Sequence, residues 1–404
     1  YLRLLDSNGR QLRYNQDGGQ GWDAPLSIVA ASSGTYYLSA ESETDFSEGG
    51  GTYTLTARHL GRDYHATPVG DIAPESGDPT LDGLSHGSGW RFEGAQVLTY
   101  SFNRLGATGL YLGGAWTETA KDAIRSALHA WEAVADLHFV EIDGGSTIEF
   151  NLADIALVHA GGSLLDTTLG EGIFPDPAHA DLYLYSLGLD RTAYPRPEGD
   201  IFLYDKVYDM ALRHEGSVGH WAGLHELGHV LGLKHPFDDG GNNRPTFEEM
   251  GIAAEDTVEW TSMSYTTSTA AGGESFPTTP MVLDILAIQR LYGANNRYHD
   301  TDNTYHLADD GLISTLWDTG GIDWLDAGEI DSGIELNLEA GSLNRYGYLQ
   351  NTTAIAYDVI IENARGGAGA DTLRGNASDN QLDGGPGADI LSGGLGHDHY
   401  FVDH

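Results

Sequence analysis

Three histidines and one glutamate form the pattern in this sequence with the clearest chemical potential. His225 and His229 are four residues apart, so on a helix both imidazoles project from one face and can bind the same cation. Glu226 is rotated by about 100° around such a helix. It is therefore a poor third ligand, but its carboxylate can reach a water bound to the metal. Gly232 lets the chain turn back, and His235 supplies a third nitrogen. Three neutral imidazoles leave one open position on a tetrahedral zinc, as in catalytic sites.

The alternative is a pair of structural histidines on an amphipathic helix, which a His-Glu-x-x-His match alone does not exclude. Gly232 and His235 extend the match to five positions, which favours a zinc site. The extended pattern is the metzincin signature, and metzincins also have a turn that contains methionine. Met263 follows further along the chain, within Ser-Met-Ser-Tyr at 262–265. With Pro236 directly after the third histidine, the pattern resembles the serralysin family of secreted bacterial proteases.

The resemblance implies an α+β metzincin catalytic domain of the zincin-like type, followed by a parallel β-roll. It implies one catalytic zinc ion with three protein ligands: His225, His229 and His235. It further implies that Met263 forms a hydrophobic floor beneath these ligands, and that Tyr265 is an additional, movable zinc ligand with a catalytic role. Glu226 is the candidate general base. Protein or peptide substrates would follow from this assignment.

The composition limits the kinds of molecule that this protein can be expected to bind. Acidic residues number 60 and basic residues 20, which gives a net charge of −40. A field of that sign repels nucleic acid and anionic membranes and attracts divalent cations. The absence of cysteine excludes disulfides and thiol catalysis, so bound metal is the candidate for cross-linking the fold. No apolar run is long enough to predict a membrane span. We expect a monomer.

The first part of the chain predicts a small β domain and a connection. Residues 1–60 contain short alternating runs separated by turns, including 1–5, 34–39 and 51–56. They resemble part of the bacterial pre-peptidase C-terminal domain, a β-sandwich, with the chain beginning within that domain. Residues 61–88 are rich in glycine and proline and are predicted to be a linker, with an ordered surface strap as the alternative.

The catalytic domain is expected at 89–295. Its apolar patterns predict strands at 97–102, 137–142, 147–152, 182–185 and 200–204. The segment 117–137 predicts an amphipathic helix, and 282–295 predicts a helix closed by glycine. In metzincins an edge strand before the zinc helix pairs with the substrate backbone. The candidates for that strand are Leu182, Tyr183 and Leu184.

A nine-residue repeat marks the last part of the chain, 366–404. Glycines recur in register, apolar side chains recur once in each repeat, and aspartates recur in most copies. This pattern is typical of the RTX parallel β-roll, in which calcium lies between one turn and the next turn but one. The candidate calcium ligands are Gly366, Gly369, Asp371, Gly375, Gly384, Gly387, Asp389, Gly393, Gly396 and Asp398. Asn380 stands where the other copies have aspartate, which predicts a weaker site there.

The connector at 296–365 also resembles the family, in the runs 317–323 and 360–363. The resemblance implies further calcium sites between catalytic domain and roll. Their candidate ligands are Asp302, Asp318, Gly320, Gly321, Asp323, Ile360 and Glu362.

The sequence therefore predicts a secreted, extracellular bacterial zinc endopeptidase stabilised by several calcium ions and exported by a type I-like route. Serralysins continue beyond the matched region to a C-terminal export signal, and we expect that segment to be missing from this chain. One alternative is a calcium-dependent adhesion or binding protein with a vestigial protease domain. A second is a zinc hydrolase acting on something other than peptides. The cleavage specificity and the role of the N-terminal β domain do not follow from the sequence.

Overall fold

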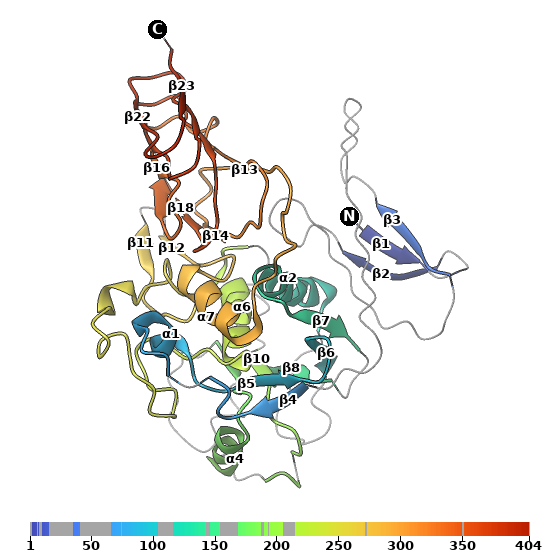
Figure 1. Ribbon diagram of the computed structural model, residues 1–404. Coiled ribbons are helices and arrows are strands. Elements are labelled where there is room, and N and C mark those ends of the chain that lie inside the picture. Colours follow the sequence, from blue (N-terminus) through green and yellow to red (C-terminus); the bar gives the residue numbers. More distant parts are fainter. Residues whose placement is uncertain are drawn as a thin grey trace.

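The computed structural model describes residues 2–5, 7, 10–15, 35–40, 66–73, 75–103, 116–142, 146–153, 169–186, 190–192, 194–204, 215–270, 273–349 and 351–403. Figure 1 shows three regions along the chain: a small N-terminal sheet, a central body of helices and strands, and a ladder of short strands that ends at the C-terminus. No helix among these residues is long and apolar enough to cross a membrane.

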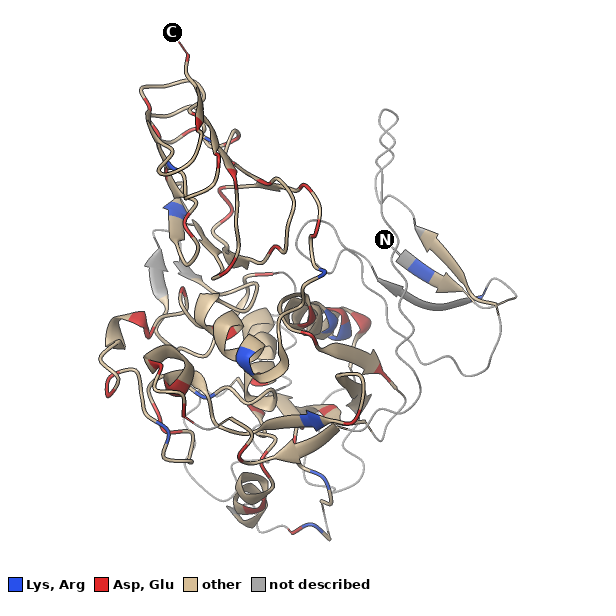
Figure 2. Ribbon diagram, in the orientation of Figure 1, with Lys and Arg blue, Asp and Glu red and all other residues tan. Residues whose placement is uncertain are grey.

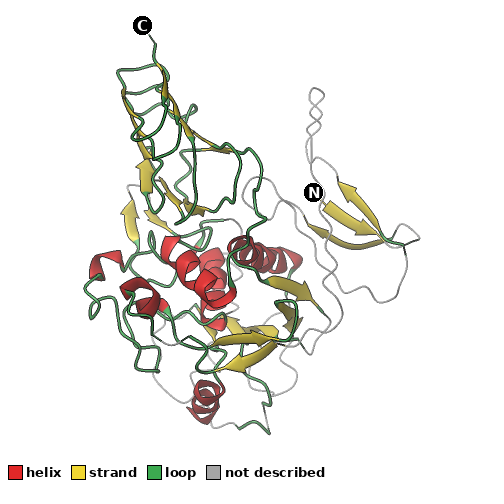
Figure 3. Ribbon diagram, viewed as in Figure 1, coloured by secondary structure: helices red, strands yellow, loops and turns green. Residues whose placement is uncertain are grey.

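The central body is built on a five-stranded sheet in the order β7-β6-β8-β10-β9. The bounds are β6 (Val97–Asn103), β7 (His138–Glu141), β8 (Ile148–Ala153), β9 (Gly170–Gly172) and β10 (Ile201–Tyr204). Four strands are parallel and β9 is antiparallel to β10. The three long helices lie together between this sheet and the C-terminal ladder (Figure 3). They are α2 (Glu118–Val134), α6 (Val218–Val230) and α7 (Val282–Tyr292). The predicted strands at 97–102, 137–142, 147–152 and 200–204 are confirmed.

Helix α2 forms where its pattern predicts it. The Thr117 hydroxyl accepts a hydrogen bond from the Ala120 backbone N–H and caps the first turn. Ile124, Leu128 and Trp131 are buried on its apolar face. The Trp131 indole N–H donates to the Leu224 carbonyl of α6 at 3.1 Å. The helix therefore packs directly against the one that carries the histidines.

The segment before the sheet is not a linker where the structure describes it. Strand β4 (Ala66–Val69) pairs with β5 (Gly89–Phe92), and helix α1 (Pro79–Leu84) is capped by the Asp78 carboxylate. Leu84 and His86 are fully buried. The Lys234 N–H donates to the Leu84 carbonyl, and the Lys234 ammonium donates to the Gly83 carbonyl at 2.7 Å. Gly70, Gly77 and Gly87 lie at bends between these elements, and backbone hydrogen bonds from His86 to Gly232 and from Lys234 to Leu84 hold the described segment against the end of α6.

The prediction of an edge strand at Leu182, Tyr183 and Leu184 is wrong. These residues lie in helix α4 (Pro177–Ser186). Proline fits the first position of a helix, and the Asp176 carboxylate accepts from the Ala178 N–H at 2.9 Å. Leu182 and Leu184 are two residues apart, so on a helix they point to different sides. Leu184 is buried in the core and Leu182 is exposed. The edges of the described sheet are β7 and β9, and β9 is the one that lies against α6.

The C-terminal region is a ladder of parallel strands. One stack has the order β13-β15-β19-β21-β23, and a second has the order β16-β20-β22. The first stack consists of β13 (Thr304–His306), β15 (Trp324–Asp326), β19 (Asn363–Arg365), β21 (Gln381–Asp383) and β23 (His399–Phe401). The second consists of β16 (Glu335–Asn337), β20 (Thr372–Arg374) and β22 (Ile390–Ser392). The stacks run through 296–365 into 366–403, so the predicted boundary at 366 is not a structural break.

The repeats predict that each turn pairs with the next turn but one, and this pairing is confirmed. Asn363 pairs with Gln381 and Thr372 pairs with Ile390, each in parallel register. Leu373 and Leu382 point inward and are fully buried. Leu391 is partly buried and Tyr400 is 49% exposed, so the inward apolar row is less covered toward the last described turn.

The remaining elements are short. Strands β14 (Ile313–Leu316), β17 (Leu343–Tyr346) and β18 (Asn351–Ile355) form a sheet between ladder and central body. A 3-10 turn at Ala253–Glu255 and a hairpin of β11 (Ser268–Ala270) and β12 (Gly273–Ser275) complete the central body. At the N-terminus, β1 (Leu2–Leu5), β2 (Gln11–Asn15) and β3 (Tyr37–Ala40) form an antiparallel sheet. The strand predicted at 51–56 lies outside the described residues, and the pre-peptidase resemblance stays a prediction.

One buried carboxylate joins the sheet of β14, β17 and β18 to the central body. Glu259 is 8% exposed and accepts two hydrogen bonds from the Arg345 guanidinium, at 2.9 and 2.8 Å, and one from the Thr352 hydroxyl at 2.7 Å. Arg345→Ala leaves this carboxylate without its charged partner. We expect the free energy of unfolding to fall by about 1–3 kcal/mol, because a buried acceptor loses a bidentate donor. Urea denaturation measures the change.

Arg374 provides the matched control. Its partner Glu335 is 64% exposed, at 3.1 Å, and exposed pairs contribute at most about 1 kcal/mol. Equal destabilisation by Arg374→Ala and Arg345→Ala would contradict the special role of Glu259.

Candidate metal centre

Helix α6 is buried along its whole length and positions two of the three histidines. The Ser217 hydroxyl caps it by accepting from the His220 N–H at 3.3 Å. Gly228 lies against the side chain of Met263, which a Cβ at that position would overlap. The helix ends at Val230, and Gly232 turns the chain with φ +103°, a conformation that favours glycine. The turn brings His235 back over the helix.

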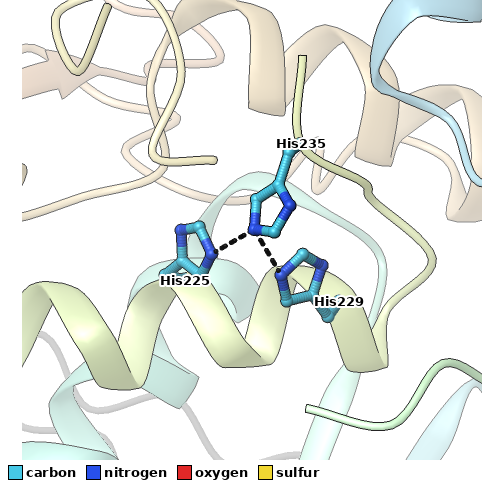
Figure 4. Close-up of side chains that lie close together, drawn as sticks. All are labelled: His225, His229 and His235. Atoms are coloured by element: carbon cyan, nitrogen blue, oxygen red, sulfur yellow. Dashed lines mark hydrogen bonds between the residues drawn. The ribbon is translucent and has the colours of Figure 1, made fainter. Parts of the chain in front are cut away.

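The three imidazoles point toward one another (Figure 4). The Nε2 atom of His235 lies 3.1 Å from Nε2 of His225 and 3.1 Å from Nε2 of His229. One ligand atom from each residue lies within 4.8 Å of the others. The predicted convergence of the three rings is therefore present in the structure.

The outer ring nitrogens each have a hydrogen-bond acceptor. Nδ1 of His225 lies 2.8 Å from the Ser262 carbonyl, and Nδ1 of His229 lies 2.8 Å from the Leu233 carbonyl. Nδ1 of His235 lies 2.6 Å from Oδ2 of Asp238. These acceptors require the proton on Nδ1 and leave three Nε2 lone pairs facing one another. Such lone pairs repel unless a cation lies between them, so the residues fit a zinc ion.

Burial keeps His225 and His229 in the neutral form that binds metal. It lowers the pKa of His225 to about 3, and the neighbouring His235 acts in the same direction. Burial also holds the pKa of His229 well below its usual range. Because neutral imidazole is the metal-binding form, no proton needs to leave these two residues at neutral pH.

The carboxyl of Glu226 is next to the cluster and almost fully buried. Burial is the main cause that raises its pKa to about 8, and the carboxylate of Glu171 adds to the shift. A cation bound by the histidines would oppose that shift by favouring the carboxylate. A group whose pKa can be brought near neutrality in this way is suited to act as a general base and then as an acid.

Tyr265 lies beside the histidines. Its ring centroid is 5.3 Å from that of His225 and 4.8 Å from that of His235, and the residue is 56% exposed. Burial of the hydroxyl, with the charges of Glu226 and Asp238, raises its pKa. The phenol is therefore a neutral donor at the opening of the site, next to the predicted zinc ligands.

Met263 is fully buried and lies against Gly228 of α6. Its turn is held by Asp284 at the start of α7, whose carboxylate accepts from the Thr261 hydroxyl at 2.5 Å and from the Ser262 N–H at 2.6 Å. The Ser262 carbonyl is also the acceptor for His225. Sequence reasoning missed Asp284, because no local spacing links it to a turn so much earlier in the chain.

Strand β9 approaches α6 at Glu226. A Cβ on Gly172 would lie 2.5 Å from the Glu226 carbonyl oxygen, and one on Gly170 would lie 3.0 Å from its Cγ. Glycine is therefore required for the strand to lie this close. The intervening Glu171 accepts from the Tyr183 hydroxyl at 2.9 Å. Sequence reasoning also missed Glu171 and Asp238, although Asp238 closely follows a predicted ligand in the chain.

The predicted calcium ligands lie in two groups. In the ladder, the Asp371 N–H donates to Asp389 at 3.0 Å and the Asn380 N–H donates to Asp398 at 3.1 Å, each from one turn to the next but one. A Cβ on Gly366 would lie 2.5 Å from the Gly384 carbonyl oxygen, and one on Gly375 would lie 2.4 Å from that of Gly393. A Cβ on Gly387 would overlap the Gly369 carbonyl, and one on Gly396 would overlap the Ser378 carbonyl, so the glycines let each turn pack closely on the next but one. Acidic residues are spread along the ladder (Figure 2).

The second group lies in the connector. Asp302 accepts from the Ile322 N–H, Glu362 accepts from the Asp323 N–H, and Asp318 accepts from the Gly320 N–H. Oδ2 of Asp323 is buried without a hydrogen-bond partner. Burial and the nearby carboxylates raise the pKa of Asp323 to about 7. Gly321 packs against the Thr301–Asp302 backbone, and Ile360 is exposed.

The ligand atoms of the three histidines lie within 4.8 Å of one another. Among the described residues, no three carboxylates have oxygen atoms that are all this close together. A calcium ion in either group would therefore need backbone oxygens among its ligands, which is usual for this cation.

The fold and the histidine cluster together define a metzincin zinc-peptidase domain. The Matrixin family model matches residues 91–254, and the peptidase M10 serralysin C-terminal model matches residues 283–400. The chain belongs to the serralysin family.

Relatives with similar sequences are named serralysin or metalloprotease. Serralysin of Proteus mirabilis is 32% identical over 311 residues, which cover 70% of this chain and 60% of the relative. Serralysin of Photorhabdus luminescens is 32% identical over 288 residues, covering 66% and 54%. Metalloprotease AprA of Pseudomonas entomophila is 28% identical over 328 residues, covering 74% and 63%. The chain thus spans somewhat more than half of the length of these relatives.

Another buried histidine near the metal centre, His86, gives a prediction about pH. Burial, and then the nearby His179, lower the pKa of His86 to about 4. In the unfolded chain its pKa is about 6.5, so between pH 6.5 and pH 4 the unfolded state binds more protons. Stability therefore falls as pH decreases through this window, by roughly 3 kcal/mol in total from this residue.

The measurement is urea denaturation at a series of pH values. His86→Phe should flatten the slope between pH 6.5 and 4, whereas His397→Gln, at an exposed position of the ladder, should leave it unchanged. An unaltered slope in His86→Phe would contradict the assignment.

Proposed function

We propose that this chain is a secreted zinc endopeptidase that hydrolyses peptide bonds in proteins and is stabilised by calcium. The observation that carries the proposal is the convergence of three Nε2 lone pairs beside the buried carboxylate of Glu226. Three protein ligands would leave one position on a bound zinc ion open, and Glu226 would lie beside it as a base. A structural zinc site has four protein ligands and no such base.

Each group in the site has a task in peptide hydrolysis. Zinc, when bound by the three histidines, polarises a carbonyl and lowers the pKa of water. Glu226 takes a proton from the attacking water and delivers it to the leaving amine. Tyr265, exposed at the opening, donates a hydrogen bond to the oxygen that gains charge at the scissile carbonyl. Asp238 orients His235 through Nδ1.

Strand β9 is the surface that we propose for the substrate backbone. It is a terminal strand of the described sheet and lies against α6 at Glu226. An extended peptide that adds to this edge gains backbone hydrogen bonds without regard to its side chains. We therefore assign pairing with the substrate backbone to β9, in place of residues 182–184.

The calcium ions would bind in the ladder and connector. There, aspartates from paired turns adjoin backbone carbonyls. We also propose an extracellular location for the protein, because bound calcium can cross-link a chain that has no cysteine. The acidic residues of the ladder (Figure 2) agree with an environment in which calcium is abundant.

Casein digestion tests the proposal against its rival, a calcium-dependent adhesion protein with an inactive protease domain. Protein saturated with zinc should digest casein. A zinc-selective chelator should abolish digestion with calcium held in excess, and added zinc should restore it. Zinc bound in stoichiometric amount with no digestion of casein or of a peptide library would refute the peptidase and support the adhesion protein.

A further inference from the structure

Phe237 places an aromatic ring at the opening of the histidine cluster. The ring lies 4.7 Å from that of His235 and is nearly parallel to it, at 8°. The residue is nevertheless 43% exposed. One face of the phenyl ring is therefore fixed by a predicted zinc ligand, and much of the remainder is open to solvent. An exposed apolar ring at the mouth of a polar site is a candidate contact for a ligand.

Tyr265 provides a second exposed ring next to the first. The two ring centroids are 5.1 Å apart at an angle of 49°, and Tyr265 is 56% exposed. Behind Tyr265 lies Trp221, 6.1 Å away, which stacks on Phe276 at 5.1 Å. Trp221 and Phe276 are buried. The two exposed rings therefore rest on fixed partners, and little ordering is needed when they bind an apolar group.

We propose that Phe237 and Tyr265 form an aromatic platform for the substrate, which we call the Phe237 platform. It binds an aromatic or large aliphatic side chain of a residue that flanks the scissile bond, and Phe237 is a specificity-determining residue. This inference rests on the proposed peptidase function.

The distances allow the contact. Consecutive Cα atoms in a peptide are about 3.8 Å apart, and a scissile carbonyl must lie at the histidine cluster. Phe237 is one ring-stacking distance from His235. A side chain next to the scissile bond is therefore within reach of the platform.

The acidic surroundings favour a different occupant, a lysine or arginine side chain held over the phenyl ring. However, the Asp238 carboxylate beside Phe237 already accepts from His235 at 2.6 Å and from the Gly240 N–H at 2.9 Å. The nearest carboxylate is thus engaged within the protein, and apolar contact is what the exposed ring face offers. A preference for basic residues is an outcome that would overturn the proposal.

The test compares Phe237→Ala, Phe237→Trp and the parent protein on fluorogenic peptides. The peptides differ only in having Phe, Leu, Arg or Ala at each position flanking the scissile bond. Phe237→Ala should lower kcat/KM for the Phe peptide roughly tenfold and for the Ala peptide less than about twofold. Phe237→Trp should restore the preference. Tyr348→Ala, at an exposed tyrosine in the β17–β18 turn, is the control and should change neither value.

Binding provides a readout that does not need turnover. In the Glu226→Gln background, calorimetry should show the Phe peptide bound roughly tenfold more tightly than the Ala peptide, and Phe237→Ala should remove this difference. Equal losses on all peptides, no difference in binding, or a preference for Arg would overturn the platform. If the parent protein cleaves nothing, the peptidase proposal fails, and the binding comparison still decides the platform.

Discussion

Glu226→Gln should lose peptidase activity by about 10²–10⁴-fold while the protein keeps stoichiometric zinc. The amide has nearly the same shape as the carboxyl but cannot take a proton from water. The carboxyl of Glu226 is buried and makes no contribution to the ligand set, which consists of His225, His229 and His235. The loss should therefore appear in kcat with little change in KM. Casein and peptide assays measure it beside metal analysis.

The control is Glu248→Gln, at an exposed position close in sequence to the site, which should keep full activity. Loss of zinc from Glu226→Gln would show that the carboxylate acts as a ligand. Full activity with zinc bound would show that the base is another residue. In either case the assignment of Glu226 as general base fails.

Calcium should stabilise the ladder by several kcal/mol. Asp371 is almost fully buried, and burial and the neighbouring Asp389 raise its pKa. Without a cation these carboxylates repel one another. A ligand that binds only the folded state contributes about 4 kcal/mol at a thousandfold excess over its Kd. The melting temperature of zinc-saturated protein should therefore rise steeply with calcium concentration, as differential scanning calorimetry can measure.

Asp371→Asn should remove most of this dependence, because the site loses a charged ligand. Asp379→Asn, at an exposed position of the next repeat, should retain it. A melting temperature that does not respond to calcium in the parent protein would contradict the calcium sites and leave the zinc site unaffected.

The sequence by itself determined the parts in which residues close in the chain act together. His225, His229 and His235 lie within one helix and one turn, so their spacing was sufficient to predict that they converge. The ladder could also be predicted from the sequence, because each repeat pairs with the next but one in a constant register. Helix α2 followed from its cap and apolar face.

Only the tertiary structure decided which strand borders the site and how the ligands are held. Residues 182–184 have a strand-like alternation, but Asp176 and Pro177 start a helix there. The edge position falls to β9, a very short strand that local pattern does not reveal. Asp284 holds the Met263 turn from a separate helix. Phe237 became a candidate only when its ring was seen against His235. These contacts are set by packing in three dimensions, which local spacing does not encode.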